Sequence, residues 1–166
     1  MRLSTKSRYG VRALFDIAYH SAKRPVQIQD ISRRQEISPR YLEQIFQSLK
    51  RAGILKSKRG PQGGYILAKS LKDITVKDIV RATEGDLLLV DCGPGKRRRK
   101  KNACTFDGTC VTQTVWSEAA AKLEQLFSGI SLATLCERGE QMGLQKEDIP
   151  APFRKRRGKT SVAHPA

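Results

Sequence analysis

The sequence has no long hydrophobic run. Its longest purely aliphatic stretch is Leu87-Leu88-Leu89-Val90, far short of the roughly 20 apolar residues that a membrane-spanning helix needs. The opening residues, MRLSTK, also lack the apolar core of a secretory signal peptide. We therefore expect a cytoplasmic protein with no membrane partner.

The residue sets of the common enzyme classes are missing as well. Only two histidines, His20 and His164, are present, and no Ser-His-Asp set can be assembled around them. Acids paired in a pocket-forming pattern and a glycine-rich phosphate loop are also absent. These absences argue against an enzyme.

Acidic residues are scarce: 16 Asp and Glu stand against 32 Lys and Arg, a formal net charge of +16. Two basic runs, at 96–101 and 154–159, supply much of the excess, and the remainder is spread through residues 1–84. Since no helix pairs a strongly apolar face with a basic one, the charge favours nucleic acid over a membrane surface. A nonspecific nucleic-acid binder that relies on the two runs is one alternative.

The hydrophobic periodicity of the first 53 residues predicts three helices. Helices are expected over about 7–21 and 28–35, and a third begins at Ser38-Pro39, an N-cap serine followed by a first-turn proline. Gly53 ends the third helix. This order is typical of a helix-turn-helix: two helices and a short turn are followed by a helix whose polar face carries long side chains.

A β-hairpin is predicted directly after the third helix. Strands are expected at 54–58 and 65–68, on either side of the glycine-rich segment 59–64. Thr75, followed three residues later by Asp78, begins a fourth helix. A hairpin in this position is the wing of a winged helix-turn-helix domain.

The predicted fold class is mainly α with a small β wing. A long irregular segment is followed by a helix that begins near Val111, and its apolar stripe is too extensive for one winged domain to cover. This stripe consists of Val115, Ala119, Leu123, Leu126 and Phe127. The expected divisions are a winged helix-turn-helix domain (1–84), a cysteine-containing sensor loop (85–110), a dimerisation helix with a short C-terminal helix (111–143), and a disordered basic tail (144–166).

The polar face of the third helix carries side chains that are long enough to reach base edges. They are Ser38, Arg40, Tyr41, Glu43, Gln44 and Gln47. Each base pair shows a distinct pattern in the major groove, and a carboxylate accepts a hydrogen bond from cytosine N4. Glu43 would repel phosphates, so it makes sense on a basic face only if it points at bases. The alternative to a DNA-reading role is that these side chains form the solvent-exposed face of an ordinary amphipathic helix.

At the hairpin tip, Arg59 and Gly60 are placed to enter a minor groove, where narrow A·T tracts concentrate negative potential. The alternative is a plain hairpin turn with one exposed arginine. Other cations would contact phosphates, which position a protein without specifying a sequence. These are Arg2, Lys6, Arg40, Lys56 and Lys58.

Three of the four cysteines, Cys92, Cys104 and Cys110, lie within 19 residues of glycine-rich, basic chain. In a cytosolic protein such a group favours metal or redox chemistry over a disulfide framework. Thiolates are soft ligands that hold iron–sulfur clusters and zinc. Zinc binding, direct thiol oxidation and no special role remain alternatives. Cys136, at helical spacing from Leu132, is predicted to be a core residue.

With these residues assembled, the chain resembles the IscR, NsrR and CymR group of bacterial regulators (the Rrf-two family) over roughly residues 1–143. The resemblance rests on MRLSTKSRYGVRAL, on ISPRYLEQIFQSLKRAGILKSKRGPQGGYILAK, and on the cysteine segment followed by CVTQTVW. It implies a homodimer in which two winged-helix domains flank a crossed pair of long helices. It also implies a palindromic operator in double-stranded DNA, with Glu43 as a base-reading residue.

In the sensing members, the resemblance further implies a cysteine-held cluster beside those helices. Cys104-x5-Cys110 has the spacing of the cluster-binding members, whereas the gap from Cys92 to Cys104 is longer and contains KRRRKK. Gln113 stands where the best-known cluster regulator has a histidine, and Arg8 where another branch has an acid. Candidates for the fourth ligand are Asp91, Asp107, Gln113 and an external small molecule. A [2Fe-2S] cluster is expected, with [4Fe-4S] as the alternative.

The function expected from the sequence is a sequence-specific DNA-binding transcriptional repressor that senses iron–sulfur status, redox state or nitric oxide. The alternative is a cluster-free family member that is regulated by thiol oxidation or by binding a metabolic enzyme such as cysteine synthase.

Overall fold

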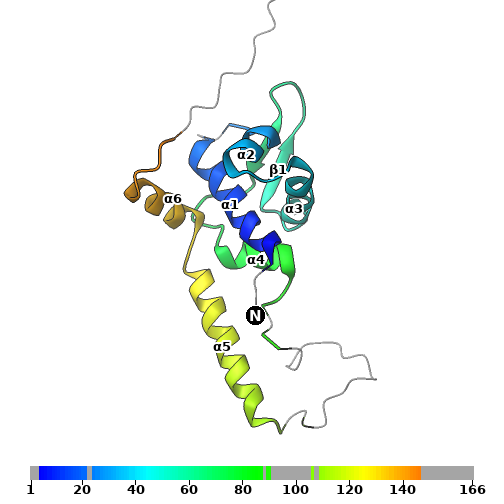
Figure 1. Cartoon of the computed structure of the whole chain (residues 1–166), viewed down its shortest axis with the longest axis vertical. Coiled ribbons are helices and arrows are strands. Elements are labelled where there is room, and N and C mark those ends of the chain that lie inside the picture. The colour runs from blue at the N-terminus through cyan, green and yellow to red at the C-terminus, as the bar shows by residue number, and fades with distance from the viewer. Residues whose placement is uncertain (1–3, 22–23, 88, 91–105, 107–108, 147–166) are drawn as a thin grey trace, which may run out of the picture.

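The computed structural model describes residues 4–21, 24–87, 89–90, 106 and 109–146. In this part of the chain six helices and one two-stranded sheet are present (Figure 1). The elements are α1 (Thr5–His20), α2 (Ile28–Gln35), α3 (Pro39–Arg51), β1 (Leu55–Lys58), β2 (Gly64–Leu67), α4 (Val76–Glu84), α5 (Val111–Ser128) and α6 (Leu132–Gln141). The mainly α fold with a small β hairpin confirms the predicted fold class. No described helix has the length and apolarity that crossing a membrane requires.

Helix α1 is the centre of the folded domain, and α2, α3, α4 and α6 all pack against it. Its inward face buries Leu14 and Ile17 completely, and α3 contributes a fully buried stripe to the same core. Gly10 lets α4 approach closely, because a Cβ at this position would lie only 3.3 Å from side-chain atoms of Ile79 and Thr83. Burial of these apolar side chains is the main force that assembles the domain.

Local hydrogen bonds define where the helices begin. The Ser38 side chain accepts from the backbone N–H of Tyr41, as expected for an N-cap. Thr75 and Asp78 form a complete capping box at the start of α4. Between α2 and α3 the chain turns at Glu36, whose φ of 53° is left-handed. The start of α1 is two residues earlier than the periodicity indicated, because the Ser4 side chain caps it.

The hairpin pairs Leu55 with Leu67 and Lys58 with Gly64 in antiparallel register. Val26, from the segment before α2, adds a bridge to Tyr65, with N···O distances of 2.9 and 2.8 Å. The hairpin is thereby tied to the helical domain at its base. β1 begins one residue later than predicted and β2 lies one residue earlier in the chain than predicted, but the predicted hairpin is present.

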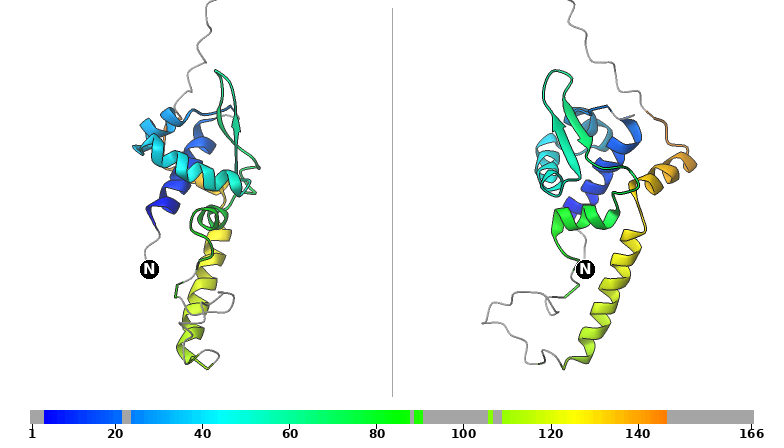
Figure 2. Two further views of the ribbon diagram at one scale, coloured as in Figure 1. Left: turned by 90° about the vertical axis from the view of Figure 1, so that its right-hand side faces the viewer. Right: turned by 180° about the vertical axis from the view of Figure 1, so that it is seen from behind.

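Helix α5 extends away from the winged-helix domain, on the side opposite the hairpin (Figures 1 and 2). None of its residues is buried within this single chain. After α5 the chain returns through α6, which packs against α1: Leu132 is fully buried, and Gly139 lies against the rings of Phe15 and Tyr19. The Tyr19 hydroxyl also donates to the carbonyl of Leu144.

Candidate nucleic-acid interface and cysteine site

Helix α3 has one apolar and one polar face. Its buried stripe consists of Leu42, Ile45, Phe46 and Leu49. On the opposite side the polar residues are exposed, and they are Ser38, Arg40, Glu43, Gln44 and Gln47. The structure thus brings most of the predicted DNA-reading residues together on one solvent-facing surface of one helix. Whether this surface contacts DNA remains a prediction.

Tyr41, the remaining predicted residue of α3, is half-buried and packs edge-on against Tyr9 of α1, with ring centroids 5.9 Å apart. The guanidinium groups of Arg8 and Arg12 lie 5.6 and 5.4 Å from the centre of the Tyr9 ring. Helix α1 therefore adds two cations near the start of α3. Neither arginine was predicted from the sequence to have a DNA role, although their spacing of four residues already indicated a shared helix face.

Glu43 lies on the side of α3 that faces the hairpin. Burial and the negative charge of Glu43 raise the pKa of the Tyr65 hydroxyl above its usual value. The Tyr65 ring packs against Phe46 of α3, with centroids 4.6 Å apart. This aromatic contact packs β2 against the helix that carries Glu43, so the polar face of α3 and the hairpin lie side by side.

The hairpin turn presents Arg59 and Gly60 to solvent. Gly60 has φ of 113°, and its carbonyl accepts from Gly63 N–H at 2.8 Å, which closes a tight turn. Lys56 and Lys58 are exposed on β1. Figure 2 shows the hairpin protruding beside α2 and α3. Of the other expected phosphate contacts, Lys6 is half-buried on α1 and Arg2 lies outside the described residues.

Cys110 is the N-cap residue of α5 and is partly exposed. Its Sγ lies 3.1 Å from the hydroxyl oxygen of Thr112. This side-chain hydrogen bond, together with backbone N–H groups of the first turn, holds the pKa of the Cys110 thiol below its usual value. A thiol that ionises easily at an open helix terminus suits a metal ligand. Cys92, Cys104, Asp91 and Asp107 lie outside the described residues.

Residues 3–138 match the Rrf2 family, which is described as iron-dependent transcriptional regulators. The chain belongs to the Rrf2 family. Protein rrf2 of Nitratidesulfovibrio vulgaris is 41% identical over 135 residues, which are 81% of this chain and 87% of that protein. The HTH-type transcriptional regulator IscR of Serratia proteamaculans is 38% identical over 135 residues, 81% of this chain and 79% of that one.

Solved structures of family members share the fold of this Rrf2 protein. T. potens IscR matches with a TM-score of 0.70 and 36% identity, covering 89% of this chain and 94% of that chain. CymR of B. subtilis, described as the global cysteine regulator, matches with a TM-score of 0.66 and 27% identity, covering 83% and 98%. The predicted family is therefore confirmed, and the chain is a DNA-binding transcriptional regulator.

Cys110 lines an open depression on the surface of this Rrf2 protein. Its lining residues are Thr109, Cys110, Val111, Gln113, Thr114, Ser117 and Glu118. Gln113, a candidate ligand from the sequence, shares the depression with Cys110. Glu118 was not singled out from the sequence, although it follows Val111 after about two helical turns and so lies on the same face of the helix. Within the described ranges, no group of three or more His, Cys, Asp or Glu side chains could hold a metal ion.

Cys136 lies on α6, beyond the end of α5 that is remote from Cys110 (Figure 1). It is partly buried rather than fully enclosed. Burial and the negative charge of Glu140 raise the pKa of its thiol. The two cysteines therefore occupy different chemical environments, and Cys136 is not the enclosed core residue that its helical spacing predicted, because α6 leaves one side of it open to solvent.

The exposed side of α5 in this Rrf2 protein is apolar. Val111, Val115, Trp116 and Leu126 are 81%, 57%, 45% and 57% exposed, respectively. Trp116, the last residue of the CVTQTVW segment, therefore has nearly half of its surface exposed to solvent in the single chain. Such a concentration of exposed apolar side chains marks an interaction surface.

Proposed function

We propose that this chain acts as a homodimeric repressor that binds a palindromic operator, with α3 in the major groove and the hairpin tip in the minor groove. One observation carries the proposal. The exposed face of α3, with Arg40, Glu43, Gln44 and Gln47, lies next to a hairpin whose exposed turn carries Arg59.

The chemistry of these side chains suits base readout. Gln44 and Gln47 offer both donors and acceptors, and Arg40 offers several donors in a fixed geometry. Glu43 would accept a hydrogen bond from cytosine N4. A narrow minor groove attracts an inserted arginine, which is the role that suits Arg59.

The DNA-binding proposal is tested by selecting preferred sites from a random duplex pool with the full chain, then comparing variants by footprinting. We expect Glu43→Ala to relax base preference at one position of each half-site, and Arg59→Ala to weaken binding to sites with A·T-rich flanks. Asp73→Ala and Lys122→Ala, at exposed residues away from the hairpin, are the matched controls. An unchanged footprint with both test variants, or no preferred site for the wild-type chain, would contradict the proposal.

The proposed dimer uses α5. This helix buries none of its residues in the single chain, and its exposed apolar side chains suit a second copy of the same helix. We expect sedimentation velocity to show a dimer for the wild-type chain and a shift toward monomer for Leu126→Glu. The neighbouring Gln125→Glu changes charge at an exposed polar position and should leave the dimer intact. A dimer that survives Leu126→Glu and Val115→Glu together would exclude this interface.

For the signal, we propose that Cys92, Cys104 and Cys110 hold an iron–sulfur cluster, most simply [2Fe-2S], with Gln113, an acidic residue or a small molecule as the fourth ligand. The support is the exposed, easily ionised thiol of Cys110, the iron dependence in the family's description and the IscR relatives. Gln113 and Glu118 share the depression at Cys110. A bound cluster would supply a redox-sensitive, destructible group whose loss reports iron status, oxidants or nitric oxide.

The cluster proposal is tested by purifying the protein without oxygen and counting iron and sulfide per chain alongside the visible spectrum. We expect cluster absorption in the wild-type chain, its loss in Cys110→Ser and its retention in Cys136→Ser. A colourless, iron-free protein that still binds its operator would instead favour the cluster-free alternative. In that case thiol oxidation, or capture of an enzyme such as cysteine synthase from extract, becomes the mechanism to test, as the structural match to CymR suggests.

A further inference from the structure

Helix α5 and the segment that follows it are attached to α4 and its N-cap region at two separate points. The first is a backbone bridge between Thr75 and Ser131, flanked by hydrogen bonds from Val76 N to Ile130 O and from Leu132 N to Ile74 O, both 2.9 Å. The second lies nearer the middle of α5, where Nζ of Lys77 is 3.2 Å from a carboxylate oxygen of Glu124. One attachment point would leave a hinge, whereas two attachment points define the direction of the helix.

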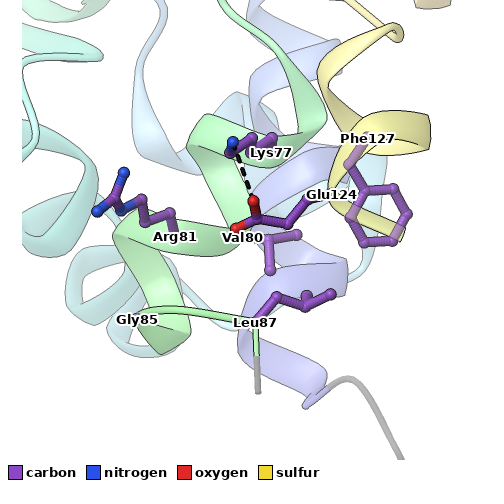
Figure 3. Close-up of a pocket in the computed structure, with 7 residues that line it drawn as sticks. All are labelled: Lys77, Val80, Arg81, Gly85, Leu87, Glu124 and Phe127. Atoms are coloured by element: carbon purple, nitrogen blue, oxygen red, sulfur yellow. Dashed lines mark ion pairs between the residues drawn. The ribbon is translucent and has the colours of Figure 1, made fainter. Parts of the chain in front are cut away.

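Apolar side chains surround the ion pair at the second attachment point. Figure 3 shows Leu87 beside Val80 of α4, in a small pocket that Phe127 of α5 also lines. Leu87 is half-buried and belongs to the segment that leaves α4. That segment is turned back by Gly85, with φ of 91°, and is held by an ion pair of 3.2 Å between Arg81 and Asp86.

No other extensive contact holds α5 to the described part of the domain, since its main packing partner is α4. The ion pair and the contacts of Leu87 are therefore the side-chain interactions best placed to orient α5 relative to the winged-helix domain. From Glu124 to the start of α5 at Val111 the helix extends roughly 20 Å, at about 1.5 Å per residue, so a small rotation at the joint becomes a large displacement at the far end.

We propose that Lys77, Glu124 and Leu87 form a joint of positioning residues that sets the spacing of the two operator half-sites. The proposal rests on homodimeric DNA binding through α5, as proposed above. In such a dimer the two copies of α3 are separated by a distance that depends on the angle of each α5, and half-sites in B-form DNA accept only a narrow range of separations. The segment between Leu87 and Cys110, which contains the other two predicted cysteine ligands, begins at this joint and ends at the N-cap of α5, at the far end of the helix that the joint orients.

The experiment measures spacing selectivity with the full-length, cluster-free dimer. A selected palindrome and versions with one or two base pairs added to or removed from its centre are titrated by fluorescence anisotropy. Selectivity is the ratio of affinities for the best and second-best spacing. We expect Lys77→Glu and Glu124→Lys each to reduce this ratio about threefold, a modest effect because both side chains are partly exposed to solvent.

The double variant Lys77→Glu/Glu124→Lys reverses the pair without changing the net charge, and we expect it to restore the selectivity. Leu87→Ala should also lower the ratio, whereas Leu89→Ala, the same change at a residue that does not line the pocket, should leave it unchanged. Lys122→Gln is the control for a lost charge elsewhere on α5, at an exposed residue that lines neither the pocket nor the depression at Cys110. Rescue by the charge swap distinguishes positioning from a simple phosphate contact at Lys77, which the swap would not restore.

Two negative results separate the inference from the function on which it rests. Specific binding with the same spacing selectivity in the single variants and in Leu87→Ala would overturn the joint and leave the DNA-binding proposal standing. A wild-type chain without any preferred palindrome would overturn the DNA-binding proposal itself. Circular dichroism of each variant confirms folding, and the charge variants alter only partly exposed side chains, so they decide the question even if Leu87→Ala unfolds.

Discussion

Arg34 of α2 donates two hydrogen bonds to the carboxylate of Asp16 in α1, at 2.6 and 2.9 Å, and the Asp16 side chain is completely buried. Gln35 donates to the same carboxylate at 3.0 Å. Arg12 in turn donates to the backbone carbonyl of Gln35 at 2.6 Å. The last residues of α2, directly before the turn into α3, are therefore held to α1 by a charged network.

Asp16→Ala should destabilise the fold strongly, because it leaves the Arg34 guanidinium buried without its carboxylate. We expect a loss of about 3–5 kcal/mol in the free energy of unfolding, measured by urea denaturation. Asp73→Ala removes an exposed carboxylate and should change stability by less than about 0.5 kcal/mol. Equal stability of the two variants would show that the buried pair contributes nothing.

Two glycines with positive φ should respond differently to alanine. A Cβ on Gly64 would lie 2.4 Å from the carbonyl oxygen of Val26, whereas a Cβ on Gly53 meets no atom within 4 Å. Gly53→Ala should therefore cost about 1 kcal/mol in backbone strain alone. Gly64→Ala should cost about 3 kcal/mol and weaken operator binding, since it separates the hairpin from the segment before α2. Thermal unfolding and anisotropy titration measure the two effects, and equal losses would argue against the close approach.

Lys58 and Arg59 should differ in how they contribute to DNA binding. Lys58→Ala should weaken binding to all sequences alike and lower the slope of log affinity against log salt by about 0.9 for each phosphate that is no longer neutralised. Arg59→Ala should instead change the preference for A·T-rich flanks. Lys122→Ala, on α5 away from the hairpin, is expected to alter neither quantity. Anisotropy titrations at several salt concentrations test this, and an unchanged slope in Lys58→Ala would exclude a phosphate contact.

Cys110 and Cys136 should differ in their pH dependence of alkylation in the reduced, cluster-free protein. Only the thiolate reacts, so the lowered pKa of Cys110 moves its reaction curve to lower pH, and the raised pKa of Cys136 moves its curve to higher pH. Iodoacetamide labelling followed by peptide mass spectrometry measures each site. Thr112→Val removes the hydroxyl beside Cys110 and should shift the alkylation curve of Cys110 back to higher pH. Thr114→Val is the control, because the Thr114 hydroxyl donates to the carbonyl of Val111 instead, and it should leave the curve unchanged. Identical curves for both cysteines would contradict the two environments.

The elements that were predicted well are those whose signals are local. Ser38-Pro39 and the Thr75–Asp78 capping box each act within three residues of chain, so their hydrogen bonds can be inferred before the fold is known. The buried stripe of α3 followed from its helical spacing in the same way. The set of exposed residues proposed to read DNA is the complement of that stripe, and it was predicted for the same reason.

The features that could not be predicted depend on residues that are distant in the chain. Nothing local indicates that Asp16 meets Arg34, or that Lys77 meets Glu124, because each pair forms only when two helices pack. Such contacts follow from packing angles, which hydrophobic periodicity does not specify.

The sequence alone was sufficient to predict the helices, the hairpin, the polar face of α3 and the family. Short-range hydrogen bonds and burial patterns depend on residues that are close together in the chain, so they can be inferred without the fold. Tertiary structure decided the direction in which α5 leaves the domain and the attachment of α2 to α1. These features depend on the distances between side chains from separate elements, and those distances are set only when the whole core packs at once.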